Sequence, residues 1–400
     1  MKILLVTQYF YPENFKSNDI AFELQRKGYT VTVLTGIPNY PSGKFFQGYG
    51  LFKKRKQTIQ GVRIIRSWLI SRGHCSGFRL ALNYFSWAFF ASWKALWLGI
   101  WYKYDAIIVH EPSPITQGIP AIIVKKIQKI PLYFWVLDLW PESLISAGGV
   151  HNKLVLSFFN GIVKYVYKNA DKLLISSRKF KDSIIKKGNF IEKLIYFPNW
   201  AEDVFKNSTA YPIPALPDGF KVMFAGNIGE AQDFEHIMQA ILLLKEKQDI
   251  QFIFIGDGRK RPWIEEFIKK HNLTKTVHIL GRFPLEAMPA FFEQADAMLL
   301  ALKDESIFNL TVPAKLQAYM AAGKPVIAML NGEGAEIIKE AACGLVVNAG
   351  DYTDLAKNIL LLKTIPTTQK KQMGEKGKQY CSQYFNKQIC IDHLIEILKI

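Results

Sequence analysis

The chain has 400 residues, of which 49% are hydrophobic and 21% are charged. This composition excludes a disordered chain, and the length predicts two domains of about 200 residues each. The formal net charge is +17, and residues 1–180 contain 24 Lys and Arg against 8 Asp and Glu, compared with 27 against 26 in the remainder. The positive excess therefore lies in the N-terminal half, which predicts a polyanionic partner such as anionic lipid, a phosphorylated substrate or nucleic acid.

Short apolar runs alternate with longer amphipathic stretches along the chain, a pattern typical of parallel sheets with helical crossovers. The chain opens on a strand-like run without a small-residue cleavage site behind it, so we expect no signal peptide and a cytoplasmic active site. In the N-terminal half we expect strands at 3–7, 30–35, 62–70, 106–109, 132–137 and 172–176.

The stretch from Leu80 to Trp93 holds no charged residue, and as a helix it would span about 21 Å, short of the roughly 30 Å core of a bilayer. A transmembrane span is therefore not expected. Aromatic residues recur every four positions here, which suits a helix lying in an anionic membrane interface. A core helix with inward aromatics is the alternative, and the two do not exclude each other. The residues proposed for membrane and acceptor contact are Phe85, Phe89, Trp93, Trp97, Trp101, Lys53, Lys54 and Arg55.

Two of the expected strands end in titratable residues. His110 and Glu111 follow one strand, and Asp138 follows the next. Groups at the carboxyl ends of parallel strands lie where ligands bind, and each of these can move a proton. The alternative is that Asp138 caps the helix that follows it and that His110 is a buried polar partner.

Prolines mark the boundary between the two halves. Pro198 and the stretch 211–219 cannot form a helix or a central strand. We expect a Rossmann-like acceptor-binding, membrane-facing domain over 1–198, a linker over 199–219, a second Rossmann-like domain over 220–375, and helices over 376–400 that pack back onto the first. Strands of the second domain are expected at 221–225, 251–255, 277–280, 297–300, 325–328 and 344–347. Two such sheets facing each other would create one deep cleft.

Two glycine-containing loops follow strands of the second domain. One contains Gly226, Asn227 and Gly229, and the other contains Gly256 and Arg259. Small residues at such turns allow a phosphate to approach closely. Backbone amides can then donate hydrogen bonds to it, and the helix dipole favours its negative charge. Neither loop matches the full dinucleotide fingerprint, and an ordinary strand-to-helix turn is the alternative.

The segment 311–327 reads as loop, helix, glycine stop and buried strand. Pro313 suits a helix first turn, which sets Lys315 near the positive end of the helix, beside any anion bound there. A solvated lysine at the helix start is the alternative.

At this point the sequence resembles glycosyltransferase family 4, in the pattern Met-Ala-x-Gly-Lys-Pro-Val-Ile over 320–327. It is more narrowly similar to the O-antigen and capsule transferases, through 313–315, 8–13, 38–43, 138–143 and 198–200. The resemblance implies an α/β GT-B fold of two Rossmann-like domains, retention at the anomeric carbon, and a UDP-sugar donor. The sugar it suggests is a deoxyamino sugar such as L-N-acetylfucosamine.

The chain departs from that family in two ways. The family's two glutamates, which have seven residues between them, fall at Leu310 and Ala318, and its basic pair falls at Asn227 and Gln232. Lys315 must then carry more of the diphosphate charge, helped by Arg259, Lys260 or Arg282. Because no Asp-x-Asp motif occurs, we expect a metal-independent enzyme without a cofactor. Lysine, arginine and backbone amides would then stabilise the negative charge of the leaving group.

The sequence thus predicts transfer of a UDP-activated sugar to an undecaprenyl-diphosphate-linked saccharide at the cytoplasmic face of an anionic inner membrane. Asp138 would act as the base, or would orient the acceptor while the leaving phosphate takes the proton. A nucleotide-sugar epimerase and a non-catalytic membrane-associated assembly partner are the alternatives. Nucleic acid is not an expected partner, since no recognition motif is found.

Overall fold

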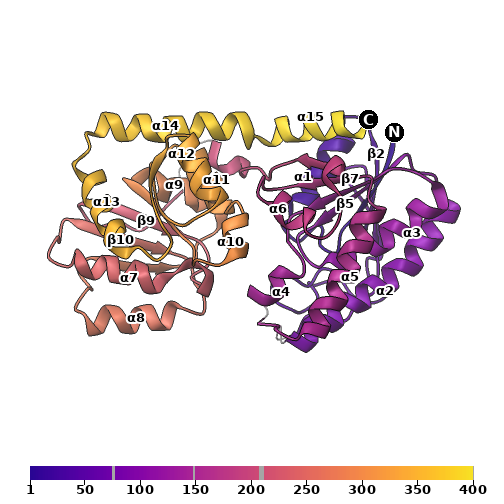
Figure 1. Cartoon of the computed structure of the whole chain (residues 1–400), viewed down its shortest axis with the longest axis horizontal. Helices are drawn as coiled ribbons and strands as arrows, with labels where there is room; N and C mark the ends of the chain where they lie inside the picture. The colour runs from indigo at the N-terminus through magenta and orange to yellow at the C-terminus, as the bar shows by residue number, and fades with distance from the viewer. Residues whose placement is uncertain (74–76, 147–148, 207–210, 400) are drawn as a thin grey trace. The chain divides into compact units, whose positions relative to one another are not determined.

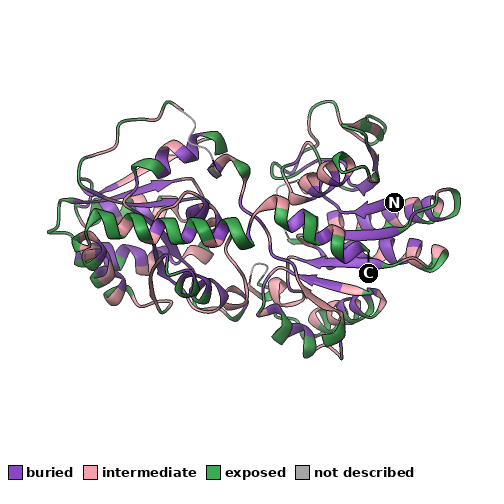
Figure 2. Cartoon of the chain, turned by 90° about the horizontal axis from the view of Figure 1, so that it is seen from above, coloured by how far each residue is buried: buried purple, intermediate pink, exposed green. Residues whose placement is uncertain are grey.

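The computed structural model describes residues 1–73, 77–146, 149–206 and 211–399. The chain divides into two units (Figure 1), of which unit 1 is Met1–Phe197 with Ile391–Ile400 and unit 2 is Pro198–Cys390. Each unit has a parallel sheet at its centre, buried between helices (Figure 2). The predicted α/β class with two parallel-sheet domains is therefore confirmed. The proline-rich stretch expected as a linker belongs to unit 2, and its residues 207–210 lie outside the described residues.

The sheet of unit 1 has the strand order β3-β4-β2-β1-β5-β6-β7-β8. Its strands are β1 (Lys2–Val6), β2 (Thr30–Thr35), β3 (Lys56–Ile59), β4 (Val62–Arg66), β5 (Ala106–Glu111), β6 (Leu132–Val136), β7 (Lys172–Ile175) and β8 (Leu194–Tyr196). Because β1 lies between β2 and β5, the crossover direction reverses at β1, and ligands of such sheets bind at this switch point.

The edge strand β3 was not predicted, and it pairs antiparallel with β4. Gln60 and Gly61 connect the two strands, with φ of 48° and 81°, which suits a two-residue hairpin turn. The polar composition of β3 hid it, since half-exposed edge strands lack an apolar run. Lys53, Lys54 and Arg55, which were assigned to the membrane, directly precede this strand.

The helices of unit 1 cover both faces of its sheet. They are α1 (Lys16–Arg26), α2 (Gly77–Trp101), α3 (Gly118–Gln128), α4 (Glu142–Ser146), α5 (Lys153–Asn169) and α6 (Phe180–Ile185), with short 3₁₀ turns η1 (Ile115–Gln117) and η2 (Ile191–Lys193). Helix α2 packs on α3, which packs on α5 (Figure 1), whereas α1 packs on β2 and β4. The side chain of Asn152 starts α5 by accepting hydrogen bonds from the amides of Leu154 and Val155.

Helix α2 has both a buried face and an exposed one. Trp87, Ala91 and Leu98 are fully buried, so this face belongs to the core. Phe89 and Trp93 on the other face are 59% and 63% exposed. Among the described residues, no helix is both long and apolar enough to cross a membrane.

The sheet of unit 2 has the order β11-β10-β9-β12-β13-β14 and is parallel throughout. Its strands are β9 (Phe220–Ala225), β10 (Ile250–Ile255), β11 (Val277–Gly281), β12 (Ala297–Ala301), β13 (Val326–Met329) and β14 (Gly344–Val347). All six were predicted, because buried parallel strands read as continuous apolar runs. The switch point lies between β9 and β12.

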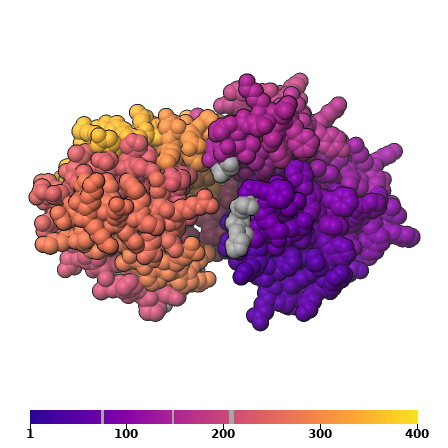
Figure 3. Space-filling model, turned by 90° about the horizontal axis from the view of Figure 1, so that it is seen from below, coloured from indigo at the N-terminus to yellow at the C-terminus, as the bar shows by residue number. Residues whose placement is uncertain are grey.

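The helices of unit 2 enclose two apolar cores, one on each face of the sheet. They are α7 (Phe234–Leu243), α8 (Arg261–Lys270), α9 (Met288–Gln294), α10 (Ser306–Leu310), α11 (Ala314–Ala321), α12 (Glu333–Glu340), α13 (Tyr352–Thr364) and α14 (Thr367–Tyr384), with η3 (Asp203–Lys206), η4 (Glu230–Gln232) and η5 (Leu285–Ala287). Each unit forms its own closely packed body (Figure 3).

The last helix, α15 (Lys387–Leu398), passes from unit 2 to unit 1. Leu394 and Ile397 are buried, and Asp392 pairs with Lys27 of α1 at 2.6 Å. Helix α14, in contrast, packs on α11 of unit 2. Of the segment 376–400, only the part from Ile391 onward therefore belongs to unit 1.

Candidate functional site

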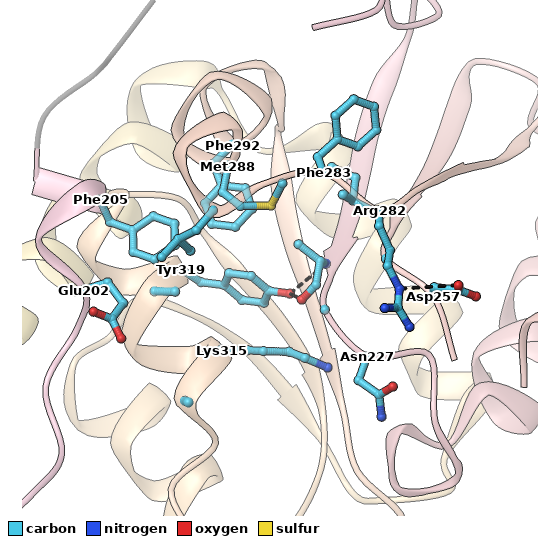
Figure 4. Close-up of a pocket in the computed structure, with 17 residues that line it drawn as sticks. Glu202, Phe205, Asn227, Asp257, Arg282, Phe283, Met288, Phe292, Lys315 and Tyr319 are labelled. Carbon is cyan, nitrogen blue, oxygen red and sulfur yellow. Dashed lines mark hydrogen bonds and ion pairs between the residues drawn. The ribbon is translucent and has the colours of Figure 1, made fainter. Parts of the chain in front are cut away.

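A pocket of about 520 Å³ lies in unit 2 at the carboxyl ends of β9 and β10. Five of the sequence-predicted residues line it, namely Gly226, Asn227, Gly256, Arg282 and Lys315. The pocket therefore lies beside the switch point of the sheet, where a parallel α/β sheet binds its ligand. Figure 4 shows the amino end of Lys315 pointing toward Asn227.

Helix α11 positions Lys315. Tyr319, one turn further along this helix, accepts a hydrogen bond from the Ala225 amide at 3.0 Å and donates one to the Ala225 carbonyl at 3.2 Å. Because residues i and i+4 share a helix face, this anchor directs Lys315 toward the end of β9. Pro313 is the residue before the helix, one position earlier than its expected place inside the first turn.

The ammonium group of Lys315 is largely buried and lacks a carboxylate partner among the described residues. Its Nζ lies 4.0 Å from the centre of the Phe224 ring and donates a hydrogen bond to Oε1 of Gln232. Burial lowers the pKa of Lys315 to about 7. In the described part of the chain, no Asp or Glu lies within ion-pair distance of it. An anion in this pocket would restore the charge of Lys315 and be neutralised by it.

The two glycine loops are held by backbone hydrogen bonds within unit 2. The amides of Gly226 and Gly256 donate to the carbonyls of Ile255 and Gly281, at 2.8 and 2.7 Å, so these two amides are engaged within the protein, and phosphate binding by the loops stays a prediction. A Cβ on Gly226 would lie 2.5 Å from Cε of Lys315, and one on Gly256 would lie 1.8 Å from the Gly226 carbonyl oxygen. With φ of 138° and 136°, both positions require glycine, which lets the loops and Lys315 approach closely.

The remaining predicted donor-site residues divide into two groups. Gln232 reaches the site through Lys315, and Gly229 lies in the Asn227 loop beside the pocket. The side chain of Arg259 is exposed and does not line the pocket. Lys260 forms ion pairs with Glu230 and Glu235, so its charge is already compensated.

Sequence analysis missed the apolar wall of the pocket. Phe205 and Phe292 stack with ring centres 5.4 Å apart and planes 3° apart, and Phe283, Leu285 and Met288 line the same pocket. These residues come from η3, the loop after β11, η5 and α9, so no local pattern joins them. Ala318, at the position of a family glutamate, also lines the pocket and offers only a methyl group.

A second polar cluster lies at the carboxyl ends of the strands of unit 1. Asp138, after β6, accepts a hydrogen bond from Nε1 of Trp140 at 3.1 Å. Burial raises the pKa of Asp138 to about 6, and the nearby side chains of Ser143, Trp140 and Ser113 oppose the shift. Asp138 is half-buried, so an acceptor can reach a carboxylate whose pKa is close to neutral, as a general base requires.

His110 and Glu111 are enclosed in the core. Their exposed fractions are 1% and 0%. Nδ1 of His110 lies 3.3 Å from Oγ1 of Thr7, and burial lowers its pKa to about 3. Burial raises the pKa of Glu111 well above its usual value, and the charge of Asp138 adds to this shift. The burial of His110 thus agrees with the buried-partner interpretation, and Asp138 alone of the three is partly exposed.

A buried glutamate that was not predicted organises the loops around this cluster. Glu13 accepts hydrogen bonds from the amides of Asn39 and Tyr40, both at 2.7 Å, and from that of Phe10 at 3.3 Å. It joins the loop after β1 to the loop after β2. Burial raises its pKa to about 7. The only sequence signal was that Glu13 and Asn39 both lie in segments that carry the family resemblance.

An exposed apolar groove of about 630 Å³ lies between α2 and α3 of unit 1. It is lined by Phe85, Ala88, Phe89, Ser92, Trp93, Leu96, Ile119 and Ile123. The aromatic stripe predicted for this helix therefore faces away from the core. Trp97 is half-buried between Lys56 and Lys94, Trp101 is exposed, and Arg55 lies over Trp68. Lys53 and Lys54 are exposed.

Comparison with known proteins identifies both units. Residues 17–200 match the family described as "Glycosyl transferase 4-like domain", and residues 219–364 match "Glycosyl transferases group 1". The probable glycosyltransferase WbjE of Pseudomonas aeruginosa is 31% identical over 56% of this chain, which spans 58% of that protein. The putative colanic acid biosynthesis glycosyl transferase WcaI of Escherichia coli K12 is 24% identical, over 75% of each chain.

Structural comparison gives the fold of the whole chain. Anabaena Alr3699/HepE in complex with UDP superimposes with a TM-score of 0.70 and 14% identity, covering 100% of both chains. At this identity the likeness establishes the fold alone. With both units matched, the chain belongs to the glycosyltransferases, combining a glycosyltransferase 4-like domain and a group 1 domain in a GT-B fold.

Proposed function

We propose that this glycosyltransferase moves a sugar from a UDP donor to a saccharide carried on polyprenyl diphosphate, with retention at the anomeric carbon and in polysaccharide biosynthesis. The observation that carries the donor half is Lys315 in the unit 2 pocket, which has no carboxylate partner among the described residues. The name of one relative refers to colanic acid biosynthesis, and one structural neighbour was solved with UDP.

The two sides of the pocket suit the two parts of a nucleotide. Lys315 and Arg282 supply positive charge, and Arg282 makes only a weak contact with Asp257, at 3.4 Å, while being 76% exposed. On the apolar side, Phe283 and the exposed Leu285 offer surface for a base, and the buried, mutually stacked Phe205 and Phe292 complete the wall. We propose that the diphosphate lies against Lys315 and that no metal ion is needed, because a preorganised cation in a poorly hydrated pocket stabilises the leaving group.

In the reaction, an acceptor hydroxyl oxygen forms a bond to the anomeric carbon while the bond from that carbon to the UDP oxygen breaks. The hydroxyl proton goes either to the carboxylate of Asp138 or to the departing phosphate. In both routes Asp138 must be ionised, since it accepts either the proton or a hydrogen bond from the hydroxyl. Lys315 must be protonated, since it offsets the charge on UDP.

Unit 1 has exposed residues of the kinds expected of a protein that binds a lipid surface. Phe89 and Trp93 project from α2 beside the apolar groove. Arg55, Lys56 and Lys94 lie close together; burial and then the charges of the other two lower the pKa of Lys94. In the described residues no carboxylate forms an ion pair with these three cations. Exposed aromatics next to uncompensated positive charge favour docking on an anionic membrane surface.

The donor sugar we propose is a deoxyamino sugar, with L-N-acetylfucosamine as the first candidate, and this choice rests on the sequence resemblance. The test is to incubate the protein with UDP-N-acetyl-L-fucosamine and a synthetic polyprenyl-diphosphate N-acetylglucosamine in EDTA, and to identify the product by mass spectrometry. A disaccharide lipid with retained anomeric configuration by NMR would support the proposal. Absence of product together with UDP binding would refute this donor and acceptor pair, and a requirement for metal would refute metal independence.

A further inference from the structure

An arginine of unit 1 is held among three tyrosine rings at the strand-end edge of the sheet. The guanidinium carbon of Arg72 lies 5.8, 5.1 and 6.0 Å from the ring centres of Tyr9, Tyr40 and Tyr84. Tyr9 follows β1, Tyr40 follows β2, Arg72 follows β4, and Tyr84 projects from α2. The faces of aromatic rings attract a cation without using its hydrogen-bond donors. The three rings, called the cage below, therefore hold the guanidinium in place and leave its hydrogen-bond donors available to another partner.

Those donors are almost unused. The one side-chain hydrogen bond of Arg72 in the described structure runs from Nη2 to the Tyr84 hydroxyl and is 3.5 Å long. Its Nε is buried without a hydrogen-bond partner, as is that of Arg66, so the two arginines differ in their terminal nitrogens. Glu13 is the carboxylate whose charge interacts with Arg72, but its two oxygens are occupied by the three backbone amides described above.

Arg66, another arginine of unit 1, serves as a comparison because hydrogen bonds within the protein hold its side chain. Nη1 of Arg66 donates to the Lys54 carbonyl at 3.1 Å and to Oε1 of Gln57 at 2.6 Å, and Nη2 donates to the Tyr11 carbonyl at 2.9 Å. Arg66 thus uses neutral oxygens of the protein to satisfy both of its terminal nitrogens, whereas Arg72 does not. A guanidinium with free terminal nitrogens matches the paired oxygens of a phosphate.

The cage is connected to the candidate catalytic carboxylate. The Ser113 side chain lies near both Tyr84 and Asp138 and lowers the pKa of each. Tyr84 in turn contacts Arg72, and its ring lies 6.4 Å from that of Trp140, the indole of which donates to Asp138. A ligand held at Arg72 would therefore have its neighbouring group beside Asp138.

We propose that Arg72 binds a phosphoryl group of the acceptor, and that Tyr9, Tyr40 and Tyr84 hold its guanidinium in place for this purpose. The inference rests on the proposed function, in which the acceptor saccharide is linked to diphosphate. In this arrangement the phosphate attached to the saccharide contacts Arg72, and the saccharide hydroxyl faces Asp138. Arg72 would then select phosphorylated acceptors over neutral ones.

The test compares two acceptors that carry the same sugar, one on polyprenyl diphosphate and one on a neutral alkyl chain. For Arg72→Gln we expect the KM of the diphosphate acceptor to rise about tenfold or more, since hydrogen bonds to a charged group contribute about 1.5–3 kcal/mol. The KM of the neutral acceptor should stay within about twofold. Arg72→Lys keeps the positive charge but lacks the paired terminal nitrogens of the guanidinium. Its KM for the diphosphate acceptor should therefore lie between those of wild type and Arg72→Gln.

The matched control is Arg63→Gln. Arg63 lies on β4, 4.2 Å from the centre of the Tyr102 ring, and its Nη2 donates to the Tyr102 hydroxyl at 2.7 Å. It is therefore also a tyrosine-stacked arginine of unit 1, and its loss should change neither KM. Equal losses of Arg72→Gln with both acceptors would show a structural role and overturn the inference. An unchanged KM for the diphosphate acceptor would overturn it as well.

A binding measurement separates this inference from the proposed function. Inorganic pyrophosphate is titrated calorimetrically into protein saturated with UDP, so that the unit 2 pocket is occupied. We expect wild type and Arg63→Gln to bind pyrophosphate and Arg72→Gln to lose about tenfold or more in affinity. Binding that depends on Arg72 supports the site even when no sugar is transferred to any lipid acceptor. Binding that is independent of Arg72 refutes the site even when transfer occurs. If Arg72→Gln has a lowered Tm, Arg72→Lys replaces it in both experiments.

Discussion

The strand-end edges of the two sheets share a topology and differ in their chemistry. In both units the crossover direction reverses beside the first strand, β1 in unit 1 and β9 in unit 2. In unit 2 burial lowers the pKa of an amine, Lys315, to about 7. In unit 1 burial raises the pKa of carboxyl groups, to about 6 for Asp138 and about 7 for Glu13. Under the proposed function, the same burial suits one edge to an anion and the other to a hydroxyl group and its proton, and the difference lies in the side chains, not in the fold.

Removal of the positive charge of Lys315 is the strongest test of this difference between the two edges. Lys315→Met keeps an apolar chain against Phe224 and removes the cation. We expect kcat/KM for the UDP-sugar to fall by about 10²–10³, the loss typical of one preorganised group that stabilises developing charge. Steady-state kinetics measure it. Lys303→Met, which removes a lysine paired with Glu230 at 3.2 Å, should change the rate by less than about twofold. Similar losses in both variants would contradict a special role for Lys315.

Asp138→Asn tests the other edge. Removal of the ionisable group should lower kcat by about 10², at the lower end of the contribution of a general base. The affinity for UDP should be unchanged, because the donor pocket lies in unit 2. Asp171→Asn is the control, since Asp171 pairs with Lys125 at 2.6 Å and lies at the start of β7, away from the strand ends. A weaker UDP affinity in Asp138→Asn would contradict the assignment of donor binding to unit 2 and of acceptor activation to unit 1.

The opposite pKa shifts predict a bell-shaped pH profile of kcat/KM. Below about pH 6 Asp138 becomes protonated and loses its function, and above about pH 7 Lys315 loses its proton and its charge. We expect a maximum between these values and a fall of about tenfold per pH unit on each side. Lys315→Met should lack the alkaline limb and Asp138→Asn the acidic limb. Limbs that persist in these variants would have to be assigned to other groups.

Gly256→Ala tests whether the glycine loops act as spacers. A Cβ there would meet the carbonyl oxygen of Gly226 at 1.8 Å, in a backbone with φ of 136°. We expect the free energy of unfolding to fall by about 1–3 kcal/mol. Chemical denaturation measures this value. Gly50→Ala, where nothing lies within 4 Å of the added carbon, should be nearly neutral, and an equal cost at both positions would argue against close approach of the loops.

The smallest effect is expected on the exposed face of α2. Trp93→Ser should weaken binding to anionic lipid vesicles by about fivefold to tenfold, because partial burial of a large aromatic side chain contributes about 1–1.5 kcal/mol. Vesicle cosedimentation measures it. Leu361→Ser, which changes a 50% exposed leucine of unit 2, is the control and should bind as wild type does. Unaltered binding of Trp93→Ser would remove the support for docking through this face.

The sequence predicted the sheets better than the sites, for physical reasons. Buried parallel strands appear as apolar runs, so β9 to β14 were found, whereas the polar edge strand β3 was not. Lys315 was found because its helix carries a local motif. Arg72 and Tyr84 come from separate loops and helices that meet only in the fold, so no spacing pattern revealed them. The orientation of α2 could not be read from the sequence, since both of its faces carry large apolar residues such as Trp87 and Trp93.

Calorimetric titration of UDP in the presence of EDTA tests the central claim most directly, because it isolates the donor half of the reaction. The account predicts that wild type and Asp138→Asn bind UDP with equal affinity and that Lys315→Met loses about tenfold or more. Failure of wild type to bind UDP, or equal affinity in Lys315→Met, would contradict the assignment of the unit 2 pocket as the donor site.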